Sequence, residues 1–491
     1  MKAIAAPPRL RLPTLAAAAL ACFLFLSYPL GIKCSGERDE HEGDHHDHSA
    51  PNACSDPERS ASDPYCTPYK TKRSLPTDLV GDDGYQWPTL YEEADDMLDA
   101  SLLMYPMATL RKIAKKEKAG DLSMTGGKKL VDVDVILKEP ATAREIEGVL
   151  TSNIALLKEA LGAEEAEVVD DALDTIIARQ STMPNAAGKR ATLEEFNDDN
   201  SQEELVYAIA TDSALKRVTL GFRGSVTRRD FLQDAQIWMT DEPNPFAGRG
   251  KGQPKKMGIH NGFHDYLFYN DTTDDTPKSK YEVIEDQVIA VLKKNPGYKL
   301  YVTGHSLGGA LSTLFAFLAS ARDEIPNPVT CVSVASPYVG DSRWKKAFQF
   351  AEARGLLRHL RVSNKKDIVT LMPFLSLRLR GYKHVGINLK LYPDTHELIY
   401  PKVGKRYQAQ AWARIWGNSL LTNPSMKYLV NHGTSEYNRR LDKAHDVLGG
   451  LYLNDLYSNR TVVGLLVNRF ADRLTDTGAA VAREDGDRKA L

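Results

Sequence analysis

The chain has 491 residues, a length that fits about three domains of roughly 150 residues or one large α/β unit with extensions. Its 63 Lys and Arg residues balance 65 Asp and Glu residues, and a net charge of -2 lacks the basic excess of nucleic-acid binders, so no nucleic-acid partner is expected. Hydrophobic residues make up 42% and charged residues 26%, which excludes a mostly disordered chain and a polytopic membrane protein.

Residues 1–33 combine early positive charges with an apolar run at 15–32. This pattern predicts a secretory signal peptide or a signal anchor, since the run is long for the first and short for the second. Either alternative sends the rest of the chain into the secretory pathway, as a secreted protein or as a membrane-anchored protein with a lumenal or extracellular folded domain. Glycosylation sequons at Asn270 and Asn459 are compatible with that route.

Residues 34–85 are rich in polar residues and poor in large apolar ones, so they predict a disordered polar stalk. The His- and Asp-rich tract at 41–48 is interpreted as a solvated polar tract, with loose metal binding as the alternative, and no defined metal site is predicted. The five cysteines are too few and too scattered for a disulfide scaffold. Cys54 and Cys66 could form one bridge in an oxidising compartment, whereas Cys331 lies in an apolar run that predicts a buried free thiol.

Downstream, the spacing of apolar residues predicts secondary structure in a clear order. Residues 91–118 and 142–180 predict helices of an extension at 86–200 that packs on the following domain. The expected elements after it are strands at 205–210 and 217–222, a helix at 281–294, a strand at 299–303, a helix at 307–322, and strands at 329–334 and 360–363. This alternation predicts an α/β fold with a mostly parallel sheet and helices on both faces, over residues 201–470, before a polar C-terminal tail at 471–491.

Residues 304–308 read Gly-His-Ser-Leu-Gly, at the point where a predicted strand ends and a predicted helix begins. In that context a G-x-S-x-G pattern places its serine on a tight turn, with glycines that leave room and a helix N-terminus that favours developing negative charge. Ser306 is therefore the candidate nucleophile. An accidental glycine-rich loop is the alternative.

A serine hydroxyl needs a histidine to accept its proton and a carboxylate to orient that histidine. Asp367 directly follows the strand predicted at 360–363, at the sheet edge where such groups gather, and is the candidate acid. The chain order serine, acid, histidine leaves several histidines after Asp367. His432 begins a polar turn before a helix and is the preferred base, whereas His384 follows the acid closely and His445 is expected on the helix surface.

With these residues assigned, the stretch at 205–437 resembles the fungal-type class 3 lipases of the α/β-hydrolase fold. The matching pieces lie at 222–225 (Phe-Arg-Gly-Ser), 260–263 (His-Asn-Gly-Phe), 304–310, 335–341 (Ala-Ser-Pro-Tyr-Val-Gly-Asp) and 364–369. The resemblance implies that Ser225 and Leu307 supply the backbone N–H groups of an oxyanion hole, each typically worth about 3 kcal/mol. It also implies a lid at 228–235, in which Phe231 and Leu232 could cover the pocket. The alternative for Phe231 is a place in the core.

The resemblance implies a serine lipase that hydrolyses the carboxylic esters of tri- or diacylglycerols at a lipid interface, without a cofactor. A phospholipase A1, a galactolipase or another carboxylesterase on the same triad remains open, because motifs do not encode the shape of the pocket and lid. A catalytically silent binding module would require a broken triad, and all five positions hold competent residues.

Two regions depart from the minimal fungal pattern: the helical extension and the long connection from Asp367 to His432. That connection is interpreted either as an ordinary solvated loop or as a basic rim that meets an anionic membrane surface. Its basic residues include Arg378, Arg380, Lys383, Lys390, Lys402, Lys405 and Arg406.

Overall fold

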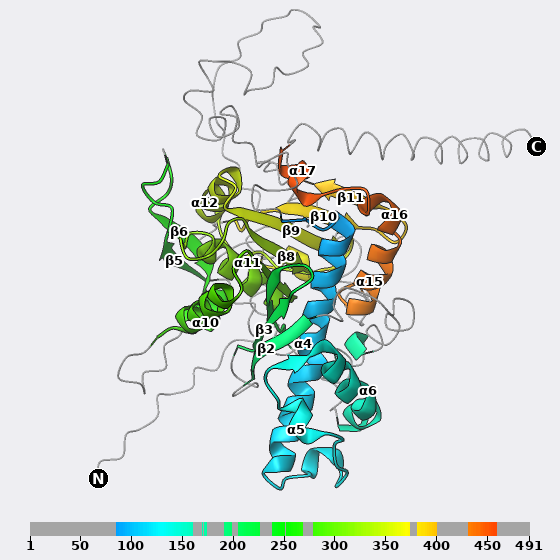
Figure 1. Cartoon of the computed structure of the whole chain (residues 1–491). Coiled ribbons are helices and arrows are strands. Elements are labelled where there is room, and N and C mark those ends of the chain that lie inside the picture. The colour runs from blue at the N-terminus through cyan, green and yellow to red at the C-terminus, as the bar shows by residue number, and fades with distance from the viewer. Residues whose placement is uncertain are drawn as a thin grey trace, which may run out of the picture. The chain divides into compact units, whose positions relative to one another are not determined.

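A computed structural model describes residues 85–160, 169, 171–173, 191–198, 205–225, 238–250, 252–268, 278–373, 381–399 and 431–458 (Figure 1). The predicted signal segment, residues 34–84 of the predicted stalk, the lid, both sequons and the C-terminal tail lie outside these residues. So does the Cys54–Cys66 pair. The last residue of the predicted stalk, Tyr85, is described and is buried in the core. In the part of the chain that the structure describes, no helix is long and apolar enough to cross a membrane.

The described strands form one mixed sheet of nine strands in the order β1-β2-β3-β4-β7-β8-β9-β10-β11. Strands β4, β7, β8, β9 and β10 run parallel, and the strands outside them pair antiparallel. Their bounds are Ala141–Thr142 (β1), Ala191–Asn197 (β2), Tyr207–Asp212 (β3), Arg217–Phe222 (β4), Lys299–His305 (β7), Val329–Val334 (β8), Leu357–Asn364 (β9), Ile387–Leu391 (β10) and His396–Ile399 (β11). A separate hairpin pairs β5 (Met239–Pro243) with β6 (Lys256–His260).

Helices cover both faces of this sheet, which confirms the predicted α/β fold class. One face packs against α9 (Asn261–Phe268), α10 (Lys280–Lys294), α11 (Leu307–Ala319) and α12 (Ser342–Ala353). The other packs against α4 (Leu90–Lys118), α15 (Thr434–Asp442), α16 (His445–Leu448) and α17 (Leu453–Ser458). Cys331 lies buried on the first side as a free thiol, as predicted, and burial raises the pKa of this thiol to about 12.

Helix α4 is the long helix predicted at 91–118, and it has two different neighbours along its length. It begins with a capping box in which Thr89 and Glu92 bond each other's backbone N–H groups, and it ends in lysines that suit a helix C-terminus. Its N-terminal half joins the core over β7 and β8, and its C-terminal half packs against α5 (Val133–Ile136), α6 (Ala143–Ala160) and β2. Figure 1 shows α4, in blue, passing from the sheet to these smaller helices.

The prediction of a helical extension missed strands β1 and β2, which lengthen the sheet by pairing with each other and with β3. Of the helix predicted at 142–180, the structure describes α6, residue 169 and residues 171–173, and all of these are helical. The division of the chain at residue 200 stays a prediction, and β2 and β3 pair across it.

Candidate active site

The turn between β7 and α11 holds Ser306 in an unusual backbone conformation. Its φ of 59° and ψ of -123° lie outside the regions that side-chain-bearing residues prefer. The neighbouring glycines make this turn possible: a Cβ on Gly304 would lie 2.4 Å from the backbone of Gly308, and one on Gly308 would lie 2.3 Å from the carbonyl oxygen of Phe222. The crossing of strand and helix therefore requires glycine at both positions.

Three predicted residues meet at this turn in a hydrogen-bonded row. His432 Nε2 lies 3.0 Å from Ser306 Oγ, and His432 Nδ1 lies 3.0 Å from Asp367 Oδ2. Asp367 follows β9 and is buried. With Nδ1–H donating to the carboxylate, Nε2 is left as the acceptor for the serine hydroxyl proton. This is the arrangement in which a histidine can act as a base toward Ser306.

Sequence reasoning missed Tyr437 on α15, which completes the surroundings of the acid. Its hydroxyl donates to Asp367 Oδ2 at 2.7 Å, and the backbone N–H of Val369 donates to Asp367 Oδ1 at 2.9 Å. Burial and the adjacent carboxylate raise the pKa of Tyr437 well above its ordinary value, so the hydroxyl remains a donor. Both carboxylate oxygens are thus fixed.

The other two histidines considered as bases lie elsewhere. His384 stacks on Tyr338 with 3.6 Å between ring centroids, and its Nε2 lies 2.7 Å from the carbonyl oxygen of Thr370. Burial and the nearby Arg361 hold the pKa of His384 well below its ordinary value. His445 is half exposed and pairs with Asp446. The structure therefore brings His432, and neither alternative, to Ser306 and Asp367.

Residues 219–377 match the family model for Lipase (class 3), and they include both Ser306 and Asp367. This segment of the chain is similar to the class 3 lipases. The predicted family is thereby confirmed for this segment.

Relatives of the lipase domain come from plants and fungi. The "Phospholipase A1-II 5" of Oryza sativa subsp. indica is 30% identical over 211 residues, 40% of this chain and 42% of the relative. The "Secreted mono- and diacylglycerol lipase A" of Penicillium cyclopium is 29% identical over 227 residues, 45% of this chain and 63% of the relative. The match thus spans about half the length of these curated relatives. A solved lipase structure from Rhizopus microsporus var. chinensis is 21% identical, with a TM-score of 0.36 over 55% of this chain and 84% of that one.

The segment after β4 brings a second glycine-dependent contact to the lipase site. A Cβ on Gly224 would lie 2.5 Å from the carbonyl oxygen of His305 and 3.3 Å from Ser306 Cβ, so the Gly224 backbone lies directly against the nucleophile turn. Ser225 follows it, with a buried Oγ that has no hydrogen-bond partner among the described residues. Leu307, the other predicted oxyanion donor, is the first residue of α11. Phe231 and Leu232 of the predicted lid lie outside the described residues.

A buried relay that the sequence did not reveal links α4 to His432. Tyr105 Oη lies 3.0 Å from His305 Nδ1, and His305 Nε2 lies 3.0 Å from the carbonyl oxygen of His432. Burial and the neighbouring His432 hold the pKa of His305 well below its ordinary value, so this ring is neutral and carries one N–H. Burial raises the pKa of Tyr105, which therefore keeps its proton. Tyr105 accordingly donates to Nδ1, and the Nε2–H of His305 donates to the His432 carbonyl.

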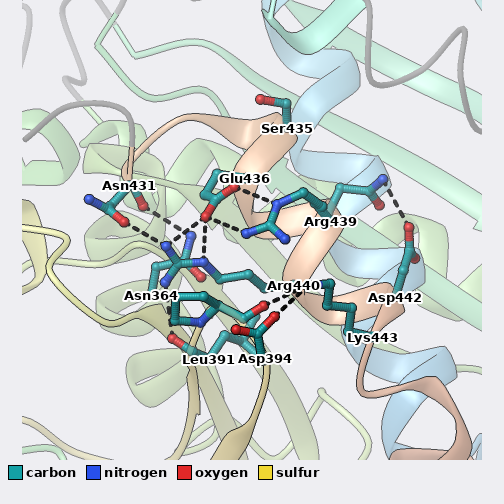
Figure 2. Close-up of polar contacts among 12 residues, drawn as sticks. Asn364, Leu391, Asp394, Asn431, Ser435, Glu436, Arg439, Arg440, Asp442 and Lys443 are labelled. Atoms are coloured by element: carbon teal, nitrogen blue, oxygen red, sulfur yellow. Dashed lines mark hydrogen bonds and ion pairs between the residues drawn. The ribbon is translucent and has the colours of Figure 1, made fainter. Parts of the chain in front are cut away.

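The loop that carries His432 is also tied to the sheet by Arg440 of α15. Figure 2 shows Arg440 close to Asn431, Glu436 and the ends of β9 and β10. Its guanidinium donates to Asn431 Oδ1 and to the carbonyl oxygen of Leu391, while Asn364 donates to the Asn431 carbonyl at 3.0 Å. The residue before His432 is therefore held on both its side chain and its backbone.

Groups of three or more His, Cys, Asp or Glu side chains arranged to hold a metal ion do not occur among the described residues of the lipase domain and its flanks. Of the basic residues noted in the long connection, Lys383 and Lys390 are described, and the other five lie outside the described residues.

Proposed function

We propose that this chain is a serine hydrolase that cleaves carboxylic ester bonds of acylglycerols. The observation that carries the proposal is the row of hydrogen bonds from Ser306 through His432 to Asp367, with 3.0 Å at each step. Ser306 and Asp367 of this row lie inside the segment that matches the class 3 lipases, and His432 follows that segment. Serine, base and acid of this kind occur in the order and environment that acyl transfer requires.

The proposed reaction proceeds in two halves. Ser306 Oγ attacks the ester carbonyl carbon while His432 Nε2 takes the hydroxyl proton, and the resulting imidazolium is stabilised by Asp367. The backbone N–H groups of Ser225 and Leu307 bind the oxyanion, and His432 returns the proton to the departing alcohol. Water, deprotonated by His432, then attacks the acyl-enzyme, releases the fatty acid and restores Ser306. No cofactor takes part in this scheme.

For the substrate we propose mono-, di- or triacylglycerols presented at a lipid interface, with 228–235 as a lid that carries Phe231 and Leu232. The relatives support an acylglycerol or a phospholipid, since the Penicillium proteins are named mono- and diacylglycerol lipases and the rice proteins phospholipases A1. A phospholipase A1 activity is therefore the second candidate. A panel of emulsified triacylglycerol, diacylglycerol and phosphatidylcholine separates the two, and exclusive release of the sn-1 fatty acid from phosphatidylcholine would favour the second.

We also propose that residues 1–33 deliver the chain to the secretory pathway. The name of the Penicillium relatives, "Secreted mono- and diacylglycerol lipase A", describes proteins that are exported. N-terminal sequencing of the protein from culture medium and from membranes separates cleavage of this segment from its retention.

The decisive test of the chemistry is Ser306→Ala. We expect activity on short-chain esters to fall by about six orders of magnitude, as when the nucleophile of such a triad is removed. Labelling by an active-site serine phosphonate should disappear with it. The control is Ser342→Ala, which removes an exposed hydroxyl at the start of α12 and should leave labelling and activity unchanged. More than about one per cent residual activity in a folded Ser306→Ala protein would exclude Ser306 as the nucleophile.

A further inference from the structure

Helix α15 begins two residues after His432 and has no cap of its own. Its N-cap residue is Gly433, which has no side chain to bond the first N–H groups of the helix. Such N–H groups have no partner within the helix, and a side-chain oxygen normally accepts from them. The partner here comes from 263 residues earlier in the chain.

Asp171 supplies that partner with a single carboxylate oxygen. Its Oδ2 accepts hydrogen bonds from the backbone N–H of Thr434, from the Thr434 hydroxyl at 2.6 Å and from the backbone N–H of Ser435 at 3.1 Å. A carboxylate at this end of a helix is favourable also because the N-terminus carries partial positive charge. Asp171 thus caps α15 from the extension predicted at 86–200, which was predicted only to pack on the following domain.

The location of this cap determines what it can influence. On the other side of His432, the loop is held through Asn431 by Asn364 and Arg440. His305 holds the carbonyl oxygen of His432 itself. Asp171 fixes the chain immediately after the histidine, so the imidazole is anchored on both sides along the backbone. Reacting groups must keep their alignment to within a fraction of an ångström, and a shift of about 1 Å can cost about a hundredfold in rate.

We propose that Asp171 is a positioning residue of this enzyme. By capping α15 from a distant part of the same chain, it holds His432 in line between Ser306 and Asp367. The inference rests on the proposed function of the triad. It gives the extension predicted at 86–200 a role in catalysis, because this extension supplies the cap of the helix that follows His432.

Asp171→Ala tests the proposal on a soluble short-chain ester. We expect kcat to fall about ten- to a hundredfold while KM changes little, because the side chain does not contact substrate and the loss is in alignment. The rate of phosphonate labelling at Ser306 should fall in proportion. The control is Asp134→Ala, which removes an exposed carboxylate of α5 in the same N-terminal segment and should leave kcat unchanged.

A second substitution separates positioning from a general effect on folding. Gly433 has φ of -60° and ψ of 147°, a conformation open to any residue and typical of an N-cap. Gly433→Ser can therefore provide in cis the acceptor that Asp171→Ala removes. We expect the double variant to regain at least about half of the lost activity on a logarithmic scale. An effect of Asp171 on the stability of the N-terminal segment alone would not respond to this change.

Each outcome decides the proposal. Wild-type kcat in a folded Asp171→Ala protein overturns it, and so does a loss of kcat that Gly433→Ser leaves unrepaired. If Asp171→Ala does not fold, Asp171→Asn keeps one oxygen acceptor and should show a smaller loss that Gly433→Ser again repairs. Failure of the proposed function would be distinguishable, because Ser306→Ala would then retain activity whatever the result at Asp171.

Discussion

His432 and His384 both follow Asp367 in the sequence, but their side chains make different contacts and are expected to have different roles. The ring of His432 lies between a hydroxyl and a carboxylate, whereas that of His384 is stacked on Tyr338 and bonded to a backbone carbonyl. We expect His432→Ala to reduce kcat by about as much as Ser306→Ala, because the two residues act as a unit. His384→Ala should lower stability and change kcat by no more than about tenfold. Steady-state kinetics on folded variants measures both, and the reverse pattern would move the base to His384.

Tyr105 is 200 residues from its partner His305 and is the next side chain whose loss should be informative. Tyr105→Phe keeps the ring but leaves the buried Nδ1 of His305 without its donor, which should cost about 1–3 kcal/mol of unfolding free energy. Because His305 holds the His432 carbonyl, we also expect a fall in kcat of about tenfold with little change in KM. Urea unfolding and initial rates give the two numbers.

The matched control for Tyr105 is Tyr207→Phe, which removes a partly buried hydrogen bond to Gln287 on the side of the sheet near α10. It should lower stability without altering kcat. Equal kinetic losses in both variants would show that kcat merely follows stability, and would exclude a role for the relay.

The residue types and chain order of the triad could be predicted from the sequence because they form local patterns at the ends of predicted strands. Their supports could not. Tyr437, Tyr105 and Asp171 bond to partners that lie 70, 200 and 263 positions away, and nothing near them in the sequence indicates those partners. These hydrogen bonds form only when the chain has folded and distant segments lie side by side.

The same distinction applies to whole elements. Strands β4 and β8 begin and end at the residues predicted, because both are short runs rich in β-branched and apolar residues. Strand β2 was missed because its sequence Ala-Thr-Leu-Glu-Glu-Phe-Asn has no clean alternation, and its pairing with β3 includes a register shift. Strand β10, Ile-Asn-Leu-Lys-Leu, does carry a period-two pattern that would have identified it.

Helix α4 is joined to the sheet by a buried ion pair as well as by apolar packing. Arg358 of β9 donates to Glu93 of α4 at 2.6 Å, and both side chains are fully buried. The indole of Trp87 lies 3.7 Å from the guanidinium carbon, and Tyr301 donates to the same carboxylate oxygen. Removing one partner of such a pair leaves an uncompensated charge in the core.

We therefore expect Glu93→Gln to lower the free energy of unfolding by about 3–5 kcal/mol, and Glu93→Gln with Arg358→Met to recover much of that loss. Urea titration of the full chain measures both. The control is Glu159→Gln, which removes an exposed partner of Lys128 and should cost less than about 1 kcal/mol. A double variant less stable than Glu93→Gln would contradict this expectation. It would mean that the loss in Glu93→Gln does not come from the uncompensated charge of Arg358.

The chain as a whole is proposed to act at a lipid surface, and that proposal depends on the predicted lid. The segment after the predicted oxyanion residue reads Arg-Arg-Asp-Phe-Leu-Gln-Asp-Ala at 228–235, with two large apolar residues among polar ones. Covering the pocket in water would bury Phe231 and Leu232, and opening on lipid would bury them elsewhere. The transfer is worth about 1.5–3 kcal/mol for each fully buried large apolar side chain.

A bias of that size from one side chain shifts a two-state lid by about one to two orders of magnitude. Activity per enzyme should therefore rise sharply when an ester exceeds its solubility limit and forms an interface. Phe231→Ser should reduce this rise while leaving the rate on dissolved monomers nearly unchanged, because the side chain takes no part in bond cleavage. Val131→Ser, which removes an exposed apolar side chain 48% accessible outside the lipase domain, should keep the full rise. A smooth saturation curve through the solubility limit in the wild type would remove the lid from the mechanism and leave an esterase with an open site.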